Sequence, residues 1–296
     1  MSIRSKVIAV LILCFGSSIL YLVFGRFDTS EVIVAVLDTG IDRDHPWLQG
    51  RVINGFDFAS WDRDASDPDG HGTHVAGIIA GEAPDARLLS VRVITEDDDV
   101  RNTAWAILYS VLRGADVINM SFIEPRNLLT EWAIAYGRFK GVVFVASSGN
   151  QGRNRVSYPS RYKGVYRIAA YDPVRQRVFG NVDDNVRFVA PGINIESSWL
   201  GRGTAPKSGT SMSAGYVSGV IACLKSAMPG LRPDELDDYL ERISTEFSVT
   251  RMGEAKPWQT LRLVDLDRFR SGLASGMPLE QYLFSAVYPN PAVDHT

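Results

Sequence analysis

A series of short apolar runs, each of strand length, constrains the fold of this chain more than any other feature of its sequence. The runs are continuous, rich in β-branched residues, and span residues 32–37, 88–94, 117–120, 142–147, 166–170 and 186–189. Stretches with helical patterns lie between and after them, at residues 103–113, 128–140, 210–227 and 233–243. Strands that are apolar along their whole length are typical of parallel sheets buried on both faces. The sequence therefore predicts an α/β fold, a mostly parallel sheet with helices on both faces.

Two of the expected helices carry start signals in the sequence. Thr103 follows Asn102, and Pro233 is followed by two acidic residues, Asp234 and Glu235. A polar residue before the first turn, or a proline and acids within it, is typical of a helix amino terminus. We therefore expect these helices to begin at Thr103 and Pro233.

Three short segments place an acid, a base and a hydroxyl group beside small residues. Asp38 lies in AVLDTG (35–40), His71 opens HGTHVAG (71–77), and Ser211 lies in GTSMSA (209–214). A serine hydroxyl is a weak nucleophile, so it needs an imidazole to take its proton and a carboxylate to orient that imidazole. The three segments together supply this set of groups.

Each segment alone has a simpler interpretation. An aspartate after a strand is often a cap or turn residue, Gly-Thr-Ser before a helix is often an N-cap, and a lone histidine is more often structural than catalytic. The chain has all three segments, and a further segment, SSGN (147–150), adds Asn150. Their occurrence together favours the catalytic interpretation of Asp38, His71 and Ser211.

These segments resemble those of the subtilisin-like serine proteases, in which Asp, His and Ser follow in this chain order. The resemblance runs from about residue 31 to about residue 273. It implies a subtilisin-like three-layer fold and a serine endopeptidase with Asp38, His71 and Ser211 as catalytic residues. It also implies that His74 is structural and that Asn150 donates a hydrogen bond in the oxyanion hole.

The resemblance also implies where a substrate would bind. The family holds an extended peptide between two segments, which here match Ser121-Phe122-Ile123 and Ser147-Ser148-Gly149. Relatives usually have glycines after the position of Phe122, whereas this chain has Ile123 and Glu124. We expect this difference to reshape the subsites on that edge.

The resemblance leaves two functions to distinguish. The first is peptide hydrolysis through an acyl-enzyme formed on Ser211. The second is a catalytically silent peptide-binding or scaffold protein with the same fold, for which the loss of a triad residue would be the usual sign. All three residues are retained here, so hydrolysis is the favoured interpretation.

No metal or cofactor is expected. The helix of His71 passes quickly through residues 82–84 to the next strand, without the loop that holds calcium in many relatives. Trp47 stands where those relatives have an acidic calcium ligand, and hard cations need several oxygen ligands.

Gly215 and Tyr216 also depart from the Pro-His pair usual after the serine segment. A glycine there predicts a less rigid nucleophile helix.

The amino terminus predicts a membrane anchor. Residues 7–24 are all apolar or small, and Arg4 and Lys6 precede them. The length is near the minimum for crossing a bilayer, and no clear cleavage site follows, so we expect a retained signal anchor with the enzyme domain outside the cytoplasm. A cleaved secretory signal and a secreted enzyme remain the alternative.

The rest of the chain predicts one domain and few partners. The chain has 296 residues and 45% hydrophobic content, enough to bury one large core. We therefore divide it into an anchor and linker (1–30), a peptidase domain (31–275) and a carboxyl-terminal extension (276–296). A net charge of −3, without basic clusters among aromatics, argues against a nucleic-acid partner. The short distance from the apolar segment to the first strand leaves no room for a large propeptide, so a separate folding or inhibitory partner is possible.

Two smaller features complete the sequence-based expectations. The acidic run at residues 96–99 precedes a helix and is expected to be a solvated turn. Cys14 lies in the apolar segment and Cys223 in an expected helix. The expected peptidase domain therefore has no internal pair of cysteines for a disulfide.

Overall fold

The computed structural model describes residues 31–249, 259–267 and 270–271. The predicted anchor at residues 7–24 and the predicted extension at residues 276–296 both lie outside these ranges. No helix within them is both long enough and apolar enough to cross a bilayer.

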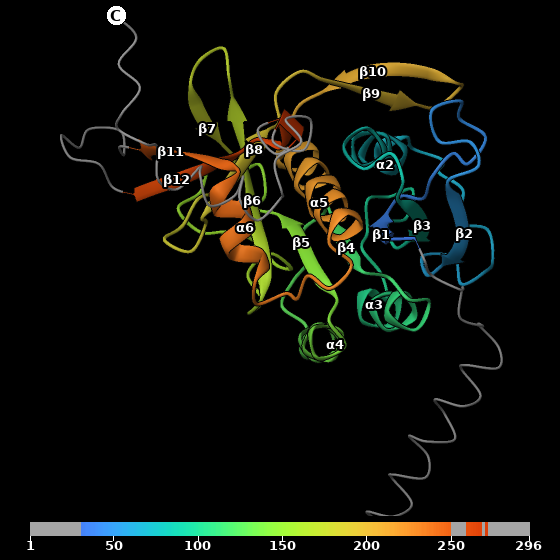
Figure 1. The fold of residues 1–296 in the computed structure, drawn as a ribbon. Coiled ribbons are helices and arrows are strands. Elements are labelled where there is room, and N and C mark those ends of the chain that lie inside the picture. Colours follow the sequence, from blue (N-terminus) through green and yellow to red (C-terminus); the bar gives the residue numbers. More distant parts are fainter. Residues whose placement is uncertain (1–30, 250–258, 268–269, 272–296) are drawn as a thin grey trace, which may run out of the picture.

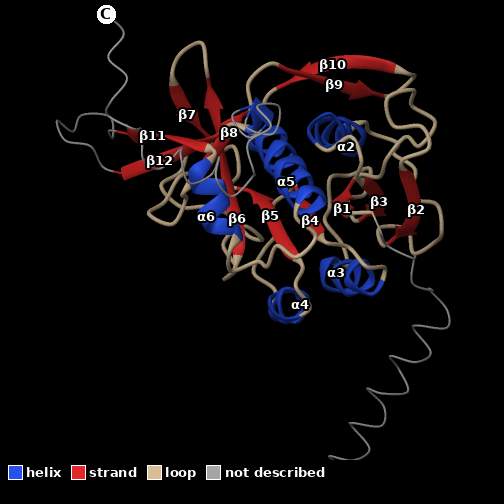
Figure 2. Ribbon diagram, viewed as in Figure 1, coloured by secondary structure: helices blue, strands red, loops and turns tan. Residues whose placement is uncertain are grey.

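A large sheet forms the middle layer of the described structure (Figure 2). Its strands are β1 (Ile33–Asp38), β2 (Val52–Asp57), β3 (Arg87–Arg92), β4 (Val117–Met120), β5 (Val143–Ser147), β6 (Val165–Asp172), β7 (Arg177–Phe179), β8 (Phe188–Pro191), β11 (Ser244–Val249) and β12 (Gln259–Val264). They lie in the order β11-β12-β8-β6-β5-β4-β1-β3-β2, with β7 paired to β6. Only the β6–β7 and β11–β12 pairs are antiparallel. The mostly parallel sheet predicted from the apolar runs is confirmed.

Helices cover both faces of this sheet (Figure 1). One face carries α2 (His71–Glu82), α5 (Thr210–Ala227) and the short α6 (Leu236–Arg242), and the other carries α3 (Thr103–Leu112) and α4 (Leu128–Phe139). Successive side chains of β1 alternate between the layers: Val34 and Val36 pack with α2 and α5, whereas Ile33 and Leu37 pack with α3 and α4. Burial on both faces explains why these strands are apolar throughout.

The predicted helix starts are confirmed in one case and wrong in the other. Helix α3 begins at Thr103, but Asn102 does not cap it: its backbone has a φ of 57° and its side-chain amide donates to the Phe58 carbonyl. Helix α6 begins at Leu236, three residues after the predicted start at Pro233. Residues 233–235 form a turn instead, in which the Glu235 carboxylate accepts the Arg232 N–H.

A separate two-stranded hairpin, β9 (Ile195–Trp199) and β10 (Gly203–Lys207), lies beside α2 (Figure 1). Ser197 and Ser198 of β9 donate their hydroxyl hydrogens to the carbonyls of His74 and Thr73, both at 2.8 Å. These two hydrogen bonds attach the hairpin to the first turn of α2.

The last described residues close onto α2 and α5. The Arg270 guanidinium donates to the Glu82 carbonyl at 3.0 Å and forms an ion pair with the Glu82 carboxylate at 3.4 Å. The Leu266 N–H donates to the Tyr216 hydroxyl at 3.1 Å. Tyr216, a departure from the family pattern, therefore fixes the carboxyl-terminal end of the domain to α5.

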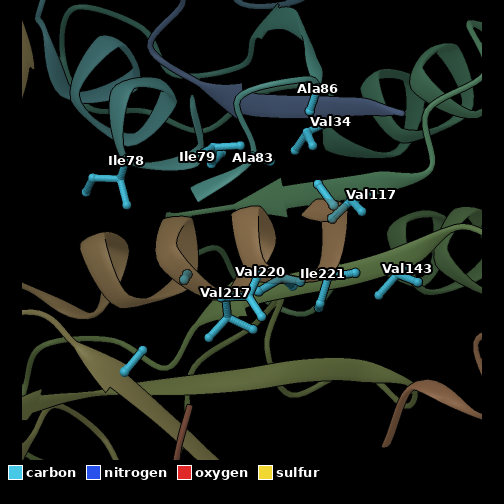
Figure 3. Packing of buried hydrophobic residues seen from close by; sticks show 14 of the residues in the cluster. Val34, Ile78, Ile79, Ala83, Ala86, Val117, Val143, Val217, Val220 and Ile221 are labelled. Atoms are coloured by element: carbon cyan, nitrogen blue, oxygen red, sulfur yellow. The ribbon is translucent and has the colours of Figure 1, made fainter. Parts of the chain in front are cut away.

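Helices α2 and α5 approach each other through small residues. Figure 3 shows Ile79 of α2, and Val217 and Val220 of α5, among the residues of one buried apolar cluster. At Gly219 of α5, an added Cβ would lie only 2.6 Å from the Glu82 Cβ and 3.0 Å from the Ile79 carbonyl oxygen. Glycine at this position is what permits the close contact.

The contact between α2 and α5 predicts a difference between two helical glycines. Gly219→Ala should lower the free energy of unfolding by about 1–3 kcal/mol, because the new methyl group forces the helices apart. Gly81→Ala is the matched control, since nothing lies within 4 Å of its added Cβ and alanine favours a helix by up to about 1 kcal/mol. Denaturant unfolding of both variants measures the difference. Equal stabilities would show that Gly219 does not set the distance between the helices.

Candidate active site

The structure brings the three sequence-predicted catalytic residues to one edge of the sheet. Asp38 ends β1, His71 is the first residue of α2, and Ser211 is the second residue of α5. In open α/β sheets, ligands bind at the carboxyl ends of the strands, where such residues converge. A cleft of about 340 Å³ opens there, lined by His71, Ser211 and Asn150 among others, with Asp38 buried behind it.

The acid and the base are hydrogen-bonded to each other. Nδ1 of His71 lies 2.6 Å from Oδ1 of Asp38, and the same oxygen accepts the Thr39 N–H at 2.8 Å. Burial opposes charge on His71, but the negative charge of Asp38 and its hydrogen bond outweigh that effect, and Asp69 and Asp67 add to it. Together they raise the pKa of His71 to about 9.

The Ser211 hydroxyl has a different partner. Its Oγ donates to the Ser121 carbonyl at 3.2 Å rather than to His71, while the Ser121 hydroxyl lies 3.2 Å from the Ser211 carbonyl oxygen. Catalytic hydrogen bonds are often formed only once substrate is bound. The structure therefore brings Ser211 and His71 into one cleft without a hydrogen bond between them.

Asn150 is held in a defined orientation by the start of α5. Its Oδ1 accepts the Thr210 N–H at 3.0 Å and the Thr210 hydroxyl at 2.9 Å. The Nδ2 group makes no hydrogen bond to any described residue, and neither does the Ser211 N–H at the open end of the helix. Two donors at the rim of the cleft are thus left available.

A further residue, Asp67, organises the site, and the sequence analysis did not identify it. Its Oδ1 accepts the Thr39 hydroxyl, the Asp69 N–H and the Gly70 N–H, at 2.8, 3.0 and 2.9 Å. Its Oδ2 accepts the N–H and hydroxyl of Thr73, at 2.8 and 2.6 Å. The only sequence signal was the Asp-Pro-Asp-Gly turn it opens, and such turns are common.

His74 connects α2 to the β9–β10 hairpin. Its buried Nε2 lies 2.9 Å from the Ala205 carbonyl oxygen and 3.1 Å from that of Ile195. Burial lowers the pKa of His74, so the ring is neutral at pH 7 and donates from Nε2. These contacts suit the structural role expected for it.

The two predicted substrate-binding segments both border the cleft. Its lining includes every residue of 121–123, together with Ser147 and Gly149, but not Ser148. Glu124, which stands where relatives usually have glycine, is turned away, and its carboxylate accepts the Thr103 hydroxyl at 2.8 Å. Burial raises the pKa of this carboxyl group. The Glu124 side chain therefore links the segment 121–124 to α3 and does not fill the cleft.

The other departures from the family pattern lie away from the cleft, Trp47 in the turn between β1 and β2 and Gly215 and Tyr216 on α5. Trp47 and Tyr216 line a separate cavity of about 480 Å³ beside the carboxyl-terminal half of α2. An added Cβ at Gly215 would lie 3.3 Å from Cγ1 of Val75, so this glycine also sits at the contact between α2 and α5. Within the described ranges, no group of three or more His, Cys, Asp or Glu side chains is placed to hold a metal ion.

Known proteins are similar to this chain in sequence and in structure. A profile of the subtilase family matches residues 29–257. The thermophilic serine proteinase of Bacillus sp. (strain AK1) is 38% identical over 231 residues, which cover 73% of this chain and only 57% of that protein. Subtilisin BL of Lederbergia lenta is 34% identical over 236 residues, which cover 75% of this chain and 87% of that protein. The crystal structure of a cold adapted subtilisin-like serine proteinase matches with a TM-score of 0.70 and 28% identity. The match covers 81% of this chain and 88% of that protein.

The raised pKa of His71 predicts a pH-dependent stability. Because the folded protein holds the proton more tightly, His71 contributes its full stabilisation below pH 6.5 and loses it as the pH rises to about 9. Over this window the free energy of unfolding should fall by about 1–3 kcal/mol relative to His71→Gln, which cannot titrate. Denaturant unfolding across this range measures the difference. A constant gap between the two proteins would contradict the assigned shift.

The hydrogen bonds of Asp67 predict a destabilising isosteric change. Asp67→Asn replaces one acceptor oxygen by an NH₂ group that cannot accept the hydrogen bonds now formed there, so unfolding should become easier by about 1–3 kcal/mol. Asp64→Asn is the control, because Asp64 is exposed and accepts hydrogen bonds only within its own turn. Thermal unfolding compares the two variants. An Asp67→Asn protein as stable as the control would refute the role given to Asp67.

Proposed function

Since this chain belongs to the subtilase family, we propose that it is a serine endopeptidase that hydrolyses peptide bonds of protein substrates. The observation that carries the proposal is the 2.6 Å hydrogen bond between Asp38 and His71, in the same cleft as Ser211. This is the arrangement that nucleophilic catalysis by serine requires.

The proposed reaction proceeds in two stages. Once substrate is bound, the Ser211 hydroxyl turns from Ser121 to the neutral form of His71, which prevails above a pH of about 9. Neutral His71 accepts the proton as Oγ attacks the scissile carbonyl. His71 then gives the proton to the leaving amine, and an acyl-enzyme remains on Ser211. A water molecule then gives a proton to His71 and attacks the acyl-enzyme, and Ser211 regains its proton as the acid product leaves. Asp38 orients His71 and stabilises its charged form throughout.

Two donors would stabilise the tetrahedral intermediate. Nδ2 of Asn150 and the N–H of Ser211 are both available at the cleft, and fixed donors aimed at a developing oxyanion are often the largest single catalytic effect. Thr210 holds the other end of the Asn150 amide, so this donor needs little reorganisation. The substrate would lie as an extended strand between residues 121–123 and 147–149.

We place the enzyme outside the cytoplasm, tethered through residues 7–24, with release after signal cleavage as the alternative. The basic residues Arg4 and Lys6 before the apolar run support this orientation. A separate folding or inhibitory partner completes the proposal. Refolding of the purified chain to full activity without any added protein would remove the need for that partner.

Loss of the nucleophile should abolish turnover. Ser211→Ala is expected to stop both hydrolysis of a peptide substrate and labelling by a fluorophosphonate probe, since both need the Ser211 oxygen. Ser213→Ala is a neighbouring control, because its hydroxyl bonds to the Ala190 and Pro191 carbonyls, away from the cleft. A folded wild-type protein that is neither labelled nor active would instead support the silent peptide-binding alternative.

Loss of the side-chain donor should slow catalysis without preventing binding. Asn150→Ala is expected to lower kcat by about 10²–10³-fold with little change in KM, a range taken from the corresponding asparagine of a subtilisin rather than derived from this structure. Steady-state kinetics measure both constants. A large rise in KM at unchanged kcat would assign Asn150 to ground-state binding instead.

A further inference from the structure

Helix α4 carries a row of large apolar side chains that nothing in the described structure covers. Leu128, Leu129, Trp132 and Phe139 are between 64% and 83% exposed, and Tyr136 is 39% exposed. At about 100° per residue, these five side chains fall within an arc of about 100° on one side of the helix. We refer to them as the α4 outer face.

The opposite side of the same helix already packs against the sheet. Thr130, Ala133, Ile134 and Gly137 are its buried residues. An ordinary surface helix has one apolar stripe, which faces the core, and a polar stripe that faces solvent. Helix α4 is apolar on both sides, and contiguous exposed apolar surface of this kind marks an interaction site.

The α4 outer face ends near the point where the chain enters the fold. Phe139 closes α4, and four residues later the Val143 N–H donates to the Asp116 carbonyl at 2.9 Å. The Asp116 carboxylate in turn accepts the Ile33 N–H at 3.0 Å, at the start of β1. The carboxyl-terminal end of α4 and the first strand therefore share the amino-terminal edge of the sheet.

The length of chain before this point limits its distance from any membrane. Residues 7–24 form the apolar run, and only residues 25–30 separate it from the first described residue, Glu31. A linker of this length spans at most about 20 Å when fully extended. If residues 7–24 lie in a bilayer, the edge beside Phe139 is held close to its surface.

The chemistry of the α4 outer face fits a lipid surface. Tryptophan, tyrosine and phenylalanine with leucine are the residues that settle at the boundary between headgroups and acyl chains. Lys140 follows the row at its carboxyl-terminal end, with its ammonium group 5.8 Å from the centre of the Tyr136 ring, and it forms no ion pair with another described residue. Cations in this place attract anionic lipid headgroups.

We propose that the α4 outer face binds the surface of a lipid bilayer, with Trp132 and Phe139 inserted among the headgroups. Because an interfacial helix lies in the plane of the membrane, the strands beside α4 would run along that plane. The cleft at their carboxyl ends would then open sideways, parallel to the lipid surface. This inference goes beyond the proposed hydrolysis and does not depend on the chemistry of Ser211.

The test places a fluorophore on the α4 outer face of the full chain. In a Ser211→Ala, Cys14→Ala, Cys223→Ala background, Phe139→Cys carries the polarity-sensitive dye NBD. The probe membrane is a vesicle of phosphatidylcholine and phosphatidylglycerol. Contact with lipid should raise NBD emission by about twofold or more, and brominated acyl chains should quench it.

The control carries the same dye at Val174→Cys, which lies in the turn between β6 and β7 and is 87% exposed, against 83% for Phe139. Its emission should not respond to vesicles. Equal responses at both positions, or none at Phe139, would overturn the proposal. A rise at Phe139 that follows protein concentration without lipid would also overturn it, in favour of a second copy of the chain. Sedimentation with the vesicles reports binding through either residues 7–24 or α4, whereas NBD emission at Phe139 reports the α4 contact alone.

Discussion

The buried carboxylate of Asp67 is the constraint on which the geometry of the site depends. It accepts hydrogen bonds from Thr39, the neighbour of Asp38, and from Thr73, two residues after His71. The Thr39 hydroxyl in turn accepts the Gly72 N–H. The end of β1 and the first turn of α2 are thus joined through the Asp67 carboxylate and the Thr39 hydroxyl. Because these supports are fixed, Asp38 and His71 meet at 2.6 Å.

Packing of the core places Ser211, the proposed nucleophile, in the same cleft as His71. His71 and Ser211 each lie at the start of a helix, and the two helices contact each other through Gly215 and Gly219. Larger residues at these glycines would move one helix start relative to the other. The distance between base and nucleophile is therefore set partly by residues well inside the core, which take no part in the proposed chemistry.

Much of this arrangement could be predicted from the sequence, because buried parallel strands and the three catalytic segments both have strong local signatures. The apolar runs located β1, β3, β4, β5, β6 and β8, and α5 has the predicted bounds. Strands β2, β7, β9, β10, β11 and β12 were not predicted, since most of them mix polar and apolar residues and depend on tertiary partners. The hydrogen bond between Asp67 and Thr39 was equally invisible, as was that between Glu124 and Thr103, because the partners lie 28 and 21 positions apart in the chain.

The closure of the carboxyl-terminal end onto α2 has a consequence for the timing of folding. β12 pairs with β8, Leu266 bonds to Tyr216, and Arg270 clamps the end of the very helix that His71 begins. These contacts join the last described residues to elements made much earlier, and such long-range contacts form late in folding. During synthesis, the three proposed catalytic residues are present well before the scaffold that aligns them can be completed. A nascent chain of this protein thus has a built-in delay before its site is assembled.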